Sequence, residues 1–139
     1  MNDQYATDPA LASLFDFARQ AALYSYSPYS GLRVGAALQL SNGEIVTGTN
    51  VECSSLGLSI CAERAALVRA IAQFGPEITI AAIAVTNLNN ASSPPCGACR
   101  QMLSEFAQPK APVRFSALDG PRTVPFSELI PEAFVMKSK

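Results

Sequence analysis

The sequence Ser-Ile-Cys-Ala-Glu-Arg at residues 59–64 and the sequence Pro-Pro-Cys-Gly-Ala-Cys-Arg-Gln at residues 94–101 hold three of the four cysteines of this chain. Cys96 and Cys99 stand one helical turn apart, so their sulfurs can point the same way from the start of a helix. A third thiolate from Cys61 would complete three protein ligands around a zinc ion and leave the fourth position open. The two stretches therefore predict a zinc site.

An open position on zinc is typical of catalytic sites, since structural zinc sites are closed by four protein ligands. Glu63 stands two residues after Cys61, and its carboxylate can accept a proton from a water at the open position and deliver it elsewhere. The chain has no histidine, which excludes Ser-His-Asp and Cys-His machinery and histidine-ligated metals. We therefore favour a catalytic zinc with Glu63 as its acid–base group.

Two other uses of the cysteines stay open but are less favoured. A Cys-x-x-Cys pair also fits a redox dithiol, which would leave the pairing of Cys61 with Glu63 unexplained. A closed four-cysteine zinc site would need Cys53, which stands eight residues before Cys61. The sequence does not assign Cys53 a role.

Both cysteine stretches stand at predicted helix N-termini, where unpaired amides stabilise thiolates and lower their pKa. Three thiolates on one Zn²⁺ would leave the site formally negative and weaken the metal as a Lewis acid. Arg64 and Arg100 adjoin the ligands and could donate hydrogen bonds to the sulfurs, which draws charge off the metal. We expect Arg64 to fill this supporting position.

Composition limits the kind of protein. A chain of 139 residues predicts one domain, 1–139, and a hydrophobic fraction of 49% leaves apolar surface that oligomerisation would bury. The net charge of −1, with no basic run, argues against a nucleic-acid polymer as partner. No stretch is apolar enough to span a membrane, and the N-terminus lacks the regions of a signal peptide. We expect a cytoplasmic protein, where reducing conditions keep cysteines as thiols.

Hydrophobic periodicity and turn formers predict the order of the secondary structure. Asp8 and Pro9 begin the first helix as cap and first residue, and Asn42-Gly43 marks a hairpin. Helices are expected at 9–24, about 60–74 and 96–106, a short helical turn at 127–130, and strands at 34–40, 45–48, 80–86, 113–118 and 123–125. Strands separated by helices imply parallel crossovers, and the hairpin makes the sheet mixed. The predicted fold is a three-layer α/β/α sandwich with a mixed five-stranded sheet.

The chain resembles the small homotetrameric zinc-dependent cytidine deaminases, whose signature joins a ligand-x-Glu element to Pro-Cys-x-x-Cys. Segments that match in order and spacing cover nearly the whole chain: 26–30, 34–37, 47–52, 61–64, 95–101 and 128–131 with Phe134. The resemblance implies a cytidine deaminase-like fold and hydrolytic deamination of cytidine and deoxycytidine to the uridines, with release of ammonia, in pyrimidine salvage. It implies one Zn²⁺ per chain, held by Cys61, Cys96 and Cys99, which activates the water that attacks C4.

The resemblance also implies roles for further residues. Glu63 would take the proton of the water, pass it to N3 and then protonate the departing amine. Asn50 and Glu52 would hold the ribose 3′-hydroxyl, and the backbone of Ala62 would meet the base. In a homotetramer with shared active sites, Phe134 would form a wall of a pocket in a neighbouring subunit.

Three positions depart from the family pattern. Leu32 stands where the family usually has the phenylalanine that stacks on the base, and leucine gives up that aromatic contact. Cys53 replaces a usual asparagine, and Leu56 stands where tyrosine is common. None of the three touches the metal or the proton path, so they bear on substrate range rather than on the reaction.

Several alternatives follow. The same chemistry could act on an N4-modified cytidine or a blasticidin-like aminopyrimidine nucleoside, which Leu32 favours. The chain could instead be a zinc-stabilised structural or binding protein, but such a protein has no need of Glu63 beside an open metal position. Editing of a polynucleotide is disfavoured because the chain lacks a basic groove.

Overall fold

One mixed sheet of five strands forms the middle of the structure, a computed structural model that describes residues 7–137. Its order is β2-β1-β3-β4-β5, with β3 and β4 parallel and the other neighbouring pairs antiparallel. The strands are β1 (Val34–Leu40), β2 (Ile45–Thr49), β3 (Ile80–Asn87), β4 (Pro112–Ala117) and β5 (Gly120–Pro125).

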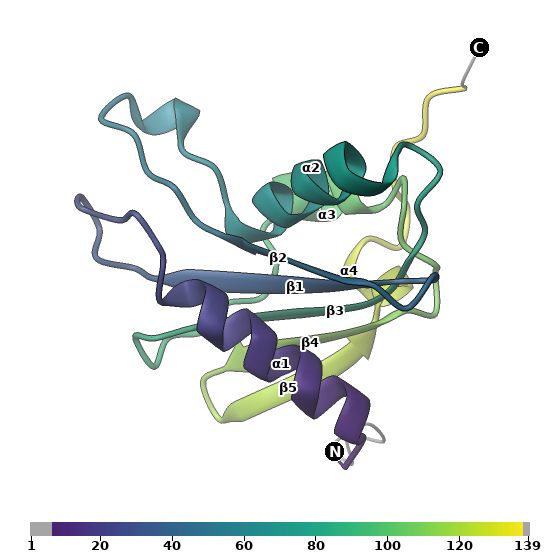
Figure 1. Ribbon diagram of the computed structural model, residues 1–139, viewed down its shortest axis with the longest axis horizontal. Helices are drawn as coiled ribbons and strands as arrows, with labels where there is room; N and C mark the ends of the chain where they lie inside the picture. The colour runs from purple at the N-terminus through teal and green to yellow at the C-terminus, as the bar shows by residue number, and fades with distance from the viewer. Residues whose placement is uncertain (1–6, 138–139) are drawn as a thin grey trace.

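Helices cover both faces of this sheet, as expected for a three-layer α/β/α arrangement. Helix α1 (Pro9–Ala22) lies on one face, and α2 (Ala62–Phe74) and α3 (Gly97–Leu103) lie together on the other (Figure 1). Two short helices, η1 (Leu56–Leu58) and α4 (Phe126–Leu129), complete the order. Because β2 and β3 are both antiparallel to β1, they run in the same direction, and α2 makes the predicted crossover between them.

The two faces of the sheet bury side chains of different size. Alanines of β1 and β3, among them Ala37 and Ala84, pack against Leu11 and Leu14 of α1. Larger residues that alternate with these alanines pack under α2 and α3, together with Leu67 and Leu103: Leu38, Leu40, Ile83 and Val85. Because successive side chains of a strand point to opposite faces of the sheet, the small alanine-rich cluster under α1 is separate from the main core under α2 and α3. Cys61 and Cys99 pack in the main core.

Several helix ends differ from the sequence prediction, each for a tertiary reason. Helix α2 begins at Ala62 rather than near Ile60, because Ile60 and Val51 exchange backbone hydrogen bonds of 2.9 and 3.0 Å. Helix α3 ends at Leu103 rather than Phe106, because the Phe106 carbonyl accepts a hydrogen bond from the Ile80 amide of β3 at 2.9 Å. The predicted start of α1 is confirmed, since Asp8 accepts from the Ala10 amide at 2.9 Å.

The sheet edges are β2 and β5. At the β2 edge, the Arg69 guanidinium of α2 donates a hydrogen bond of 3.1 Å to the Thr47 carbonyl. Strand β5 contains two prolines, Pro121 and Pro125, which have no amide hydrogen to donate. Among the helices of residues 7–137, none has both the length and the apolar character that crossing a bilayer needs.

Gly48 sets how closely α2 approaches the sheet. A Cβ atom at this position would lie 2.5 Å from the Ala62 carbonyl oxygen and would also collide with the Ala66 amide nitrogen. Both atoms belong to the backbone of α2, so no side-chain rotation relieves the clash. Helix α2, with Glu63 in its first turn, therefore sits where it does only because residue 48 has no side chain.

We expect Gly48→Ala to lower the free energy of unfolding by about 2–3 kcal/mol, because the helix must shift away from β2. Denaturant unfolding of the variant against the unsubstituted protein measures this loss. Gly57→Ala is the matched control, since a Cβ there meets no atom within 4 Å. Equal stability of the two variants would contradict the close approach.

Candidate active site

Three cysteine sulfurs meet where α2 and α3 begin. Cys61 is the residue before α2, Cys96 is the residue before α3, and Cys99 lies in the first turn of α3. The Cys61 and Cys96 sulfurs are 3.8 Å apart, those of Cys96 and Cys99 are 3.5 Å apart, and all three lie within 4.8 Å of one another. These separations are too long for a disulfide bond, and all three cysteines are free.

The sulfur positions fit a zinc ion. Zinc binds thiolates at about 2.3 Å in a tetrahedron, which places neighbouring sulfurs about 3.8 Å apart. Three protein ligands leave one tetrahedral position for a water or a substrate. Among the described residues, these cysteines make the one group of three His, Cys, Asp or Glu side chains close enough together to hold a metal ion, so Cys53 is not a fourth ligand here.

Glu63 is a buried carboxyl group at the same place. It lies in the first turn of α2 and is 4% exposed. Burial, with a smaller contribution from the neighbouring Cys61 thiolate, raises the pKa of Glu63 to about 7. A carboxyl group with a pKa near neutrality can both accept and donate a proton, which is the behaviour an acid–base group needs.

The thiols of Cys61 and Cys99 shift each other's pKa in opposite directions. Hydrogen bonds from Cys99, and then from Arg64, lower the pKa of Cys61 to about 5. Donation to Cys61, together with burial, raises the pKa of Cys99. The Arg64 Nη2 atom lies 3.7 Å from the Cys61 sulfur. This contact is the one expected of Arg64, and it places a positive charge beside a ligand sulfur.

Arg100 has a different contact set. Its Nε atom donates to the Pro95 carbonyl at 2.7 Å, and its Nη1 atom donates to the Leu129 carbonyl at 2.9 Å. Arg100 thus ties the residue before Cys96 to the end of α4. Of the two arginines that adjoin the cysteine stretches, Arg64 is the one with a hydrogen bond to a ligand sulfur.

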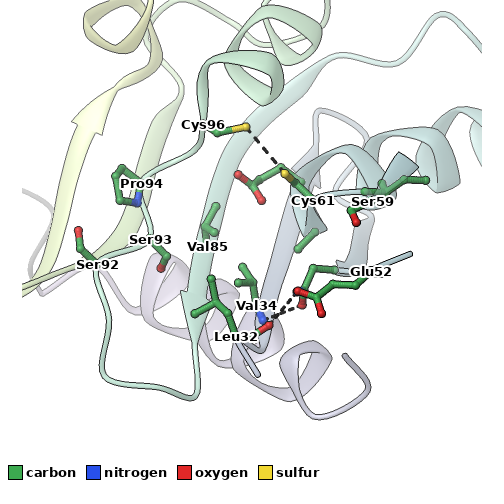
Figure 2. Close-up of a pocket in the computed structure, with 14 residues that line it drawn as sticks. Leu32, Val34, Glu52, Ser59, Cys61, Val85, Ser92, Ser93, Pro94 and Cys96 are labelled. Atoms are coloured by element: carbon green, nitrogen blue, oxygen red, sulfur yellow. Dashed lines mark hydrogen bonds between the residues drawn. The ribbon is translucent and has the colours of Figure 1, made fainter. Parts of the chain in front are cut away.

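A cavity of about 310 Å³ opens beside the sulfurs. Figure 2 shows Cys61 and Cys96 at one end of it, with Ser92, Ser93 and Pro94 along one side. Its polar and metal-binding lining includes most of the predicted site: Asn50, Glu52, Cys61, Ala62, Glu63 and Cys96. The volume lies at the small end of the range for ligand pockets, so it suits a small molecule.

Leu32, Val34 and Val85 form an apolar part of this lining, away from the sulfurs (Figure 2). Leu32 is 39% exposed, so its side chain is available to a ligand. A cavity with an aliphatic surface and a polar, metal-binding end suits a heteroaromatic ring with polar substituents.

Asn50 keeps one hydrogen-bond donor free for a ligand. Its side-chain oxygen accepts from the Ser25 hydroxyl at 2.6 Å and the Val34 amide at 2.8 Å, and its nitrogen donates to the Leu32 carbonyl at 2.8 Å. An amide nitrogen has two hydrogens, so one N–H has no partner among these contacts. Because Asn50 is held on three sides, that N–H points in a fixed direction.

Glu52 is held in a similar way. Its Oε1 atom accepts from the amides of Tyr29 and Ser30 at 3.0 and 3.2 Å, and its Oε2 atom accepts from the Ser30 hydroxyl at 2.5 Å. The serine bond first, and then the two amides, hold the pKa of Glu52 below its usual value. Glu52 is therefore a fixed, ionised acceptor at the cavity wall.

Three of the predicted site residues do not line this cavity. Cys99 is completely buried behind it, and Arg64 lies against Cys61. Phe134 lies in the C-terminal tail, 71% exposed, with its carbonyl bonded to Gln101. The prediction that Phe134 forms a wall of a pocket in a neighbouring subunit stays a prediction, since Phe134 does not line the cavity of its own chain.

The other departures from the family pattern lie outside the lining. Cys53 donates its backbone amide to the Ser59 hydroxyl at 3.1 Å, and Leu56 is 70% exposed in η1. Ser59, Ser92, Ser93 and Pro94 also line the cavity, but nothing in the sequence was a reason to assign them a site role. Ser59 and Pro94 begin the two cysteine stretches, and Ser92 and Ser93 come just before the second, which was the available signal.

Together with the layered sheet, this site places the chain among α/β enzymes that use zinc for hydrolysis. The sequence profile described as cytidine and deoxycytidylate deaminase zinc-binding region matches residues 10–114. The cytidine deaminase of Halalkalibacterium halodurans is 41% identical over 116 residues, which are 83% of this chain and 86% of that protein. The chain belongs to the zinc-binding cytidine and deoxycytidylate deaminase family, and zinc is the metal that its cysteine cluster fits.

Solved structures agree with this assignment. Cytidine deaminase from Mycobacterium tuberculosis superposes with a TM-score of 0.79 at 35% identity, over 93% of this chain and 100% of the other. Cytidine deaminase from Burkholderia pseudomallei gives a TM-score of 0.80 at 39% identity, over 88% and 98% of the two chains. The structural similarity therefore extends over most of the chain, and the family match at residues 10–114 includes both cysteine stretches.

Proposed function

We propose that this protein hydrolytically deaminates cytidine and deoxycytidine to uridine and deoxyuridine, with release of ammonia. The observation that carries the proposal is the buried Glu63 carboxyl, which lines the same ligand-sized cavity as the Cys61 and Cys96 sulfurs. Bound Zn²⁺ would supply Lewis-acid activation of water at neutral pH. A zinc-stabilised structural or binding protein would have no use for a buried carboxyl group at an open metal position.

Glu63 is the proposed proton carrier. Its carboxylate would take one proton from the attacking water and deliver it to N3, and would then take the second proton from the C4 hydroxyl group and deliver it to the amine as the C4–N bond breaks and the C4 carbonyl forms. The raised pKa of about 7 supports both directions of transfer. The Ala62 backbone, next to Glu63 in the cavity lining, would meet the polar edge of the base.

Asn50 and Glu52 are the proposed sugar-binding residues. The remaining Asn50 N–H can donate to the 3′-hydroxyl oxygen, and the Glu52 carboxylate can accept the hydroxyl proton. Hydrogen bonds through Ser30 and Leu32 connect the two side chains and fix both before a ligand binds. Ligand binding therefore does not have to supply the free energy of ordering them.

We expect Glu52→Gln to raise KM for cytidine about tenfold with little change in kcat, because it removes a charge-assisted hydrogen bond. Steady-state kinetics with cytidine and with 3′-deoxycytidine measure the effect. The unsubstituted enzyme should prefer cytidine over the 3′-deoxy compound, and the variant should lose most of that preference. An equal loss of activity toward both nucleosides would remove Glu52 from the 3′-hydroxyl contact.

The proposed reaction is tested by following the ultraviolet absorbance of cytidine with the purified, zinc-loaded protein. Conversion to uridine supports the proposal and shows that Leu32 is tolerated beside the base. Lack of turnover with about one zinc per chain would reject cytidine as substrate. The same assay with N4-modified and blasticidin-like nucleosides would then test the alternative that Leu32 favours.

We also propose a homotetramer with shared active sites. Several large apolar side chains are more than half exposed in the single chain, among them Tyr26, Tyr29, Leu56, Leu58, Val68 and Phe134. Contacts between copies of the chain would bury such side chains, which supports the proposal. Sedimentation equilibrium should give about four times the 14.7 kDa mass of one chain, and a monomer at micromolar concentration would refute the shared site.

A cytoplasmic role in pyrimidine salvage completes the proposal. A reducing compartment keeps Cys61, Cys96 and Cys99 as thiols that can bind a metal. The product of the reaction is a free nucleoside, which suits recycling of pyrimidines rather than modification of a polymer. Growth of a pyrimidine auxotroph on cytidine, dependent on this protein, is the test.

A further inference from the structure

Leu32 is presented to the cavity by a backbone segment that is bonded from outside at nearly every polar group. The Leu32 amide donates to the Ser30 hydroxyl at 3.0 Å, and its carbonyl accepts from Asn50 at 2.8 Å. Gly31 has φ +75°, a left-handed conformation that favours glycine. The Arg33 guanidinium also ties the segment to the end of α1, by donating to the Leu23 carbonyl at 2.5 Å.

Asn89 holds this segment on both sides of Leu32. Its side-chain nitrogen donates to the Gly31 carbonyl at 2.9 Å, and its side-chain oxygen accepts from the Arg33 amide at 2.9 Å. The Leu88 amide adds a third bond, to the Arg33 carbonyl at 3.0 Å. One asparagine side chain thus replaces a strand partner for residues 31–33.

Asn87 in turn fixes the loop that carries Asn89. This side chain is 5% exposed, and it uses its full hydrogen-bonding capacity. Its oxygen accepts from the amides of Asn89 and Ala91 at 2.9 and 3.0 Å, and its nitrogen donates to the Ala91 carbonyl at 2.7 Å and the Ser93 hydroxyl at 3.0 Å. The same loop continues into Ser92, Ser93 and Pro94, which line the cavity on the side opposite Glu52 (Figure 2).

We propose that Asn89 is a positioning residue that sets the distance between Leu32 and the 92–94 wall of the cavity, and so sets the affinity for the nucleoside base. The inference rests on the proposed function for its substrate. Its structural claim is that Asn89 links the segment that carries Leu32 to the loop that carries residues 92–94. Asn89 is exposed and does not line the cavity, so it acts only through Leu32 and the loop.

The test compares Asn89→Ala with the unsubstituted zinc-loaded enzyme. Loss of both side-chain bonds should raise KM for cytidine about fivefold and raise the inhibition constant of uridine by the same factor, with kcat within about twofold. Asn42→Ala is the matched control, because Asn42 also accepts a backbone amide, that of Glu44 at 2.9 Å, in the hairpin away from the cavity. The control should leave KM unchanged.

A double-variant cycle separates positioning from general loosening. If Asn89 acts through Leu32, Leu32→Ala and Asn89→Ala together should raise KM little more than Leu32→Ala alone. Additive effects on KM, or a loss confined to kcat, would overturn the proposal. Asn89→Asp, which keeps the acceptor for Arg33, should recover part of the lost affinity.

Hydrogen exchange gives a readout that does not depend on turnover. The Arg33 amide should exchange faster in Asn89→Ala than in the unsubstituted protein and in Asn42→Ala. Unchanged exchange at Arg33 would overturn the proposal whatever the kinetics. If the unsubstituted protein fails to turn over cytidine, the proposed substrate fails, and the exchange result still decides whether Asn89 holds the segment.

Discussion

Glu63→Gln is expected to reduce kcat for cytidine by about 10³-fold or more while the protein keeps its zinc. Glutamine has nearly the same size and can occupy the same place in the first turn of α2, but it cannot accept or deliver a proton. Positioned acid–base groups contribute about 10²- to 10⁴-fold, and Glu63 would serve more than one transfer in the cycle. The measurement is kcat together with zinc content by elemental analysis.

The matched control for this experiment is Glu105→Gln, which makes the same chemical change at an exposed position. It should retain the activity of the unsubstituted enzyme. Near-full activity of Glu63→Gln would show that the proton moves by another route. Loss of zinc from that variant would instead show that the carboxylate supports the metal site rather than the proton transfer.

Cys99→Ala is expected to lose both the metal and much of the stability of the fold. Cys99 is completely buried and belongs to the main core. Because only the folded chain brings the three thiolates together, the free energy of zinc binding also stabilises the fold. Zinc content should fall from about one per chain to near zero. The thermal midpoint should fall well below that of the unsubstituted protein.

A chelator separates the metal contribution from the loss of a core atom. Chelation should lower the thermal midpoint of the unsubstituted protein and have little further effect on Cys99→Ala. Cys53→Ala is the control, because Cys53 lies outside the sulfur cluster, and it should keep both zinc and stability. Normal zinc content in Cys99→Ala would remove Cys99 from the ligand set.

The order of the elements was predictable because each pattern is local. The Asn42-Gly43 hairpin, the capped start of α1 and the apolar run of β3 each follow from neighbouring residues. The ends of α2 and α3 were misplaced because distant partners decide them. Ile60 is drawn into a bridge with Val51, and the Phe106 carbonyl bonds to β3, and no pattern within one segment contains those partners.

The site also has parts that local sequence predicts and parts that distant contacts decide. The cysteine sulfurs and Glu63 were predictable because two short stretches contain both the chemistry and the helix starts that aim it. The proposed role of Asn89 was not, because its side chain bonds the backbone of a distant segment, at Gly31 and Arg33. Nothing in a loop that is rich in asparagine and serine indicates which amide will bridge to residue 31.

The two edges of the sheet have a consequence for how copies of this protein can meet. An unprotected edge strand recruits the edge of another molecule and leads to fibrous growth. Here Arg69 already occupies the Thr47 carbonyl on β2, and Pro121 and Pro125 withhold two amides on β5. Pairing of edge strands between two copies of the chain is therefore hindered at both edges of the sheet. Contacts between copies should form through helices and loops instead. The protein should stay dispersed at concentrations at which an open-edged sheet of the same size would aggregate.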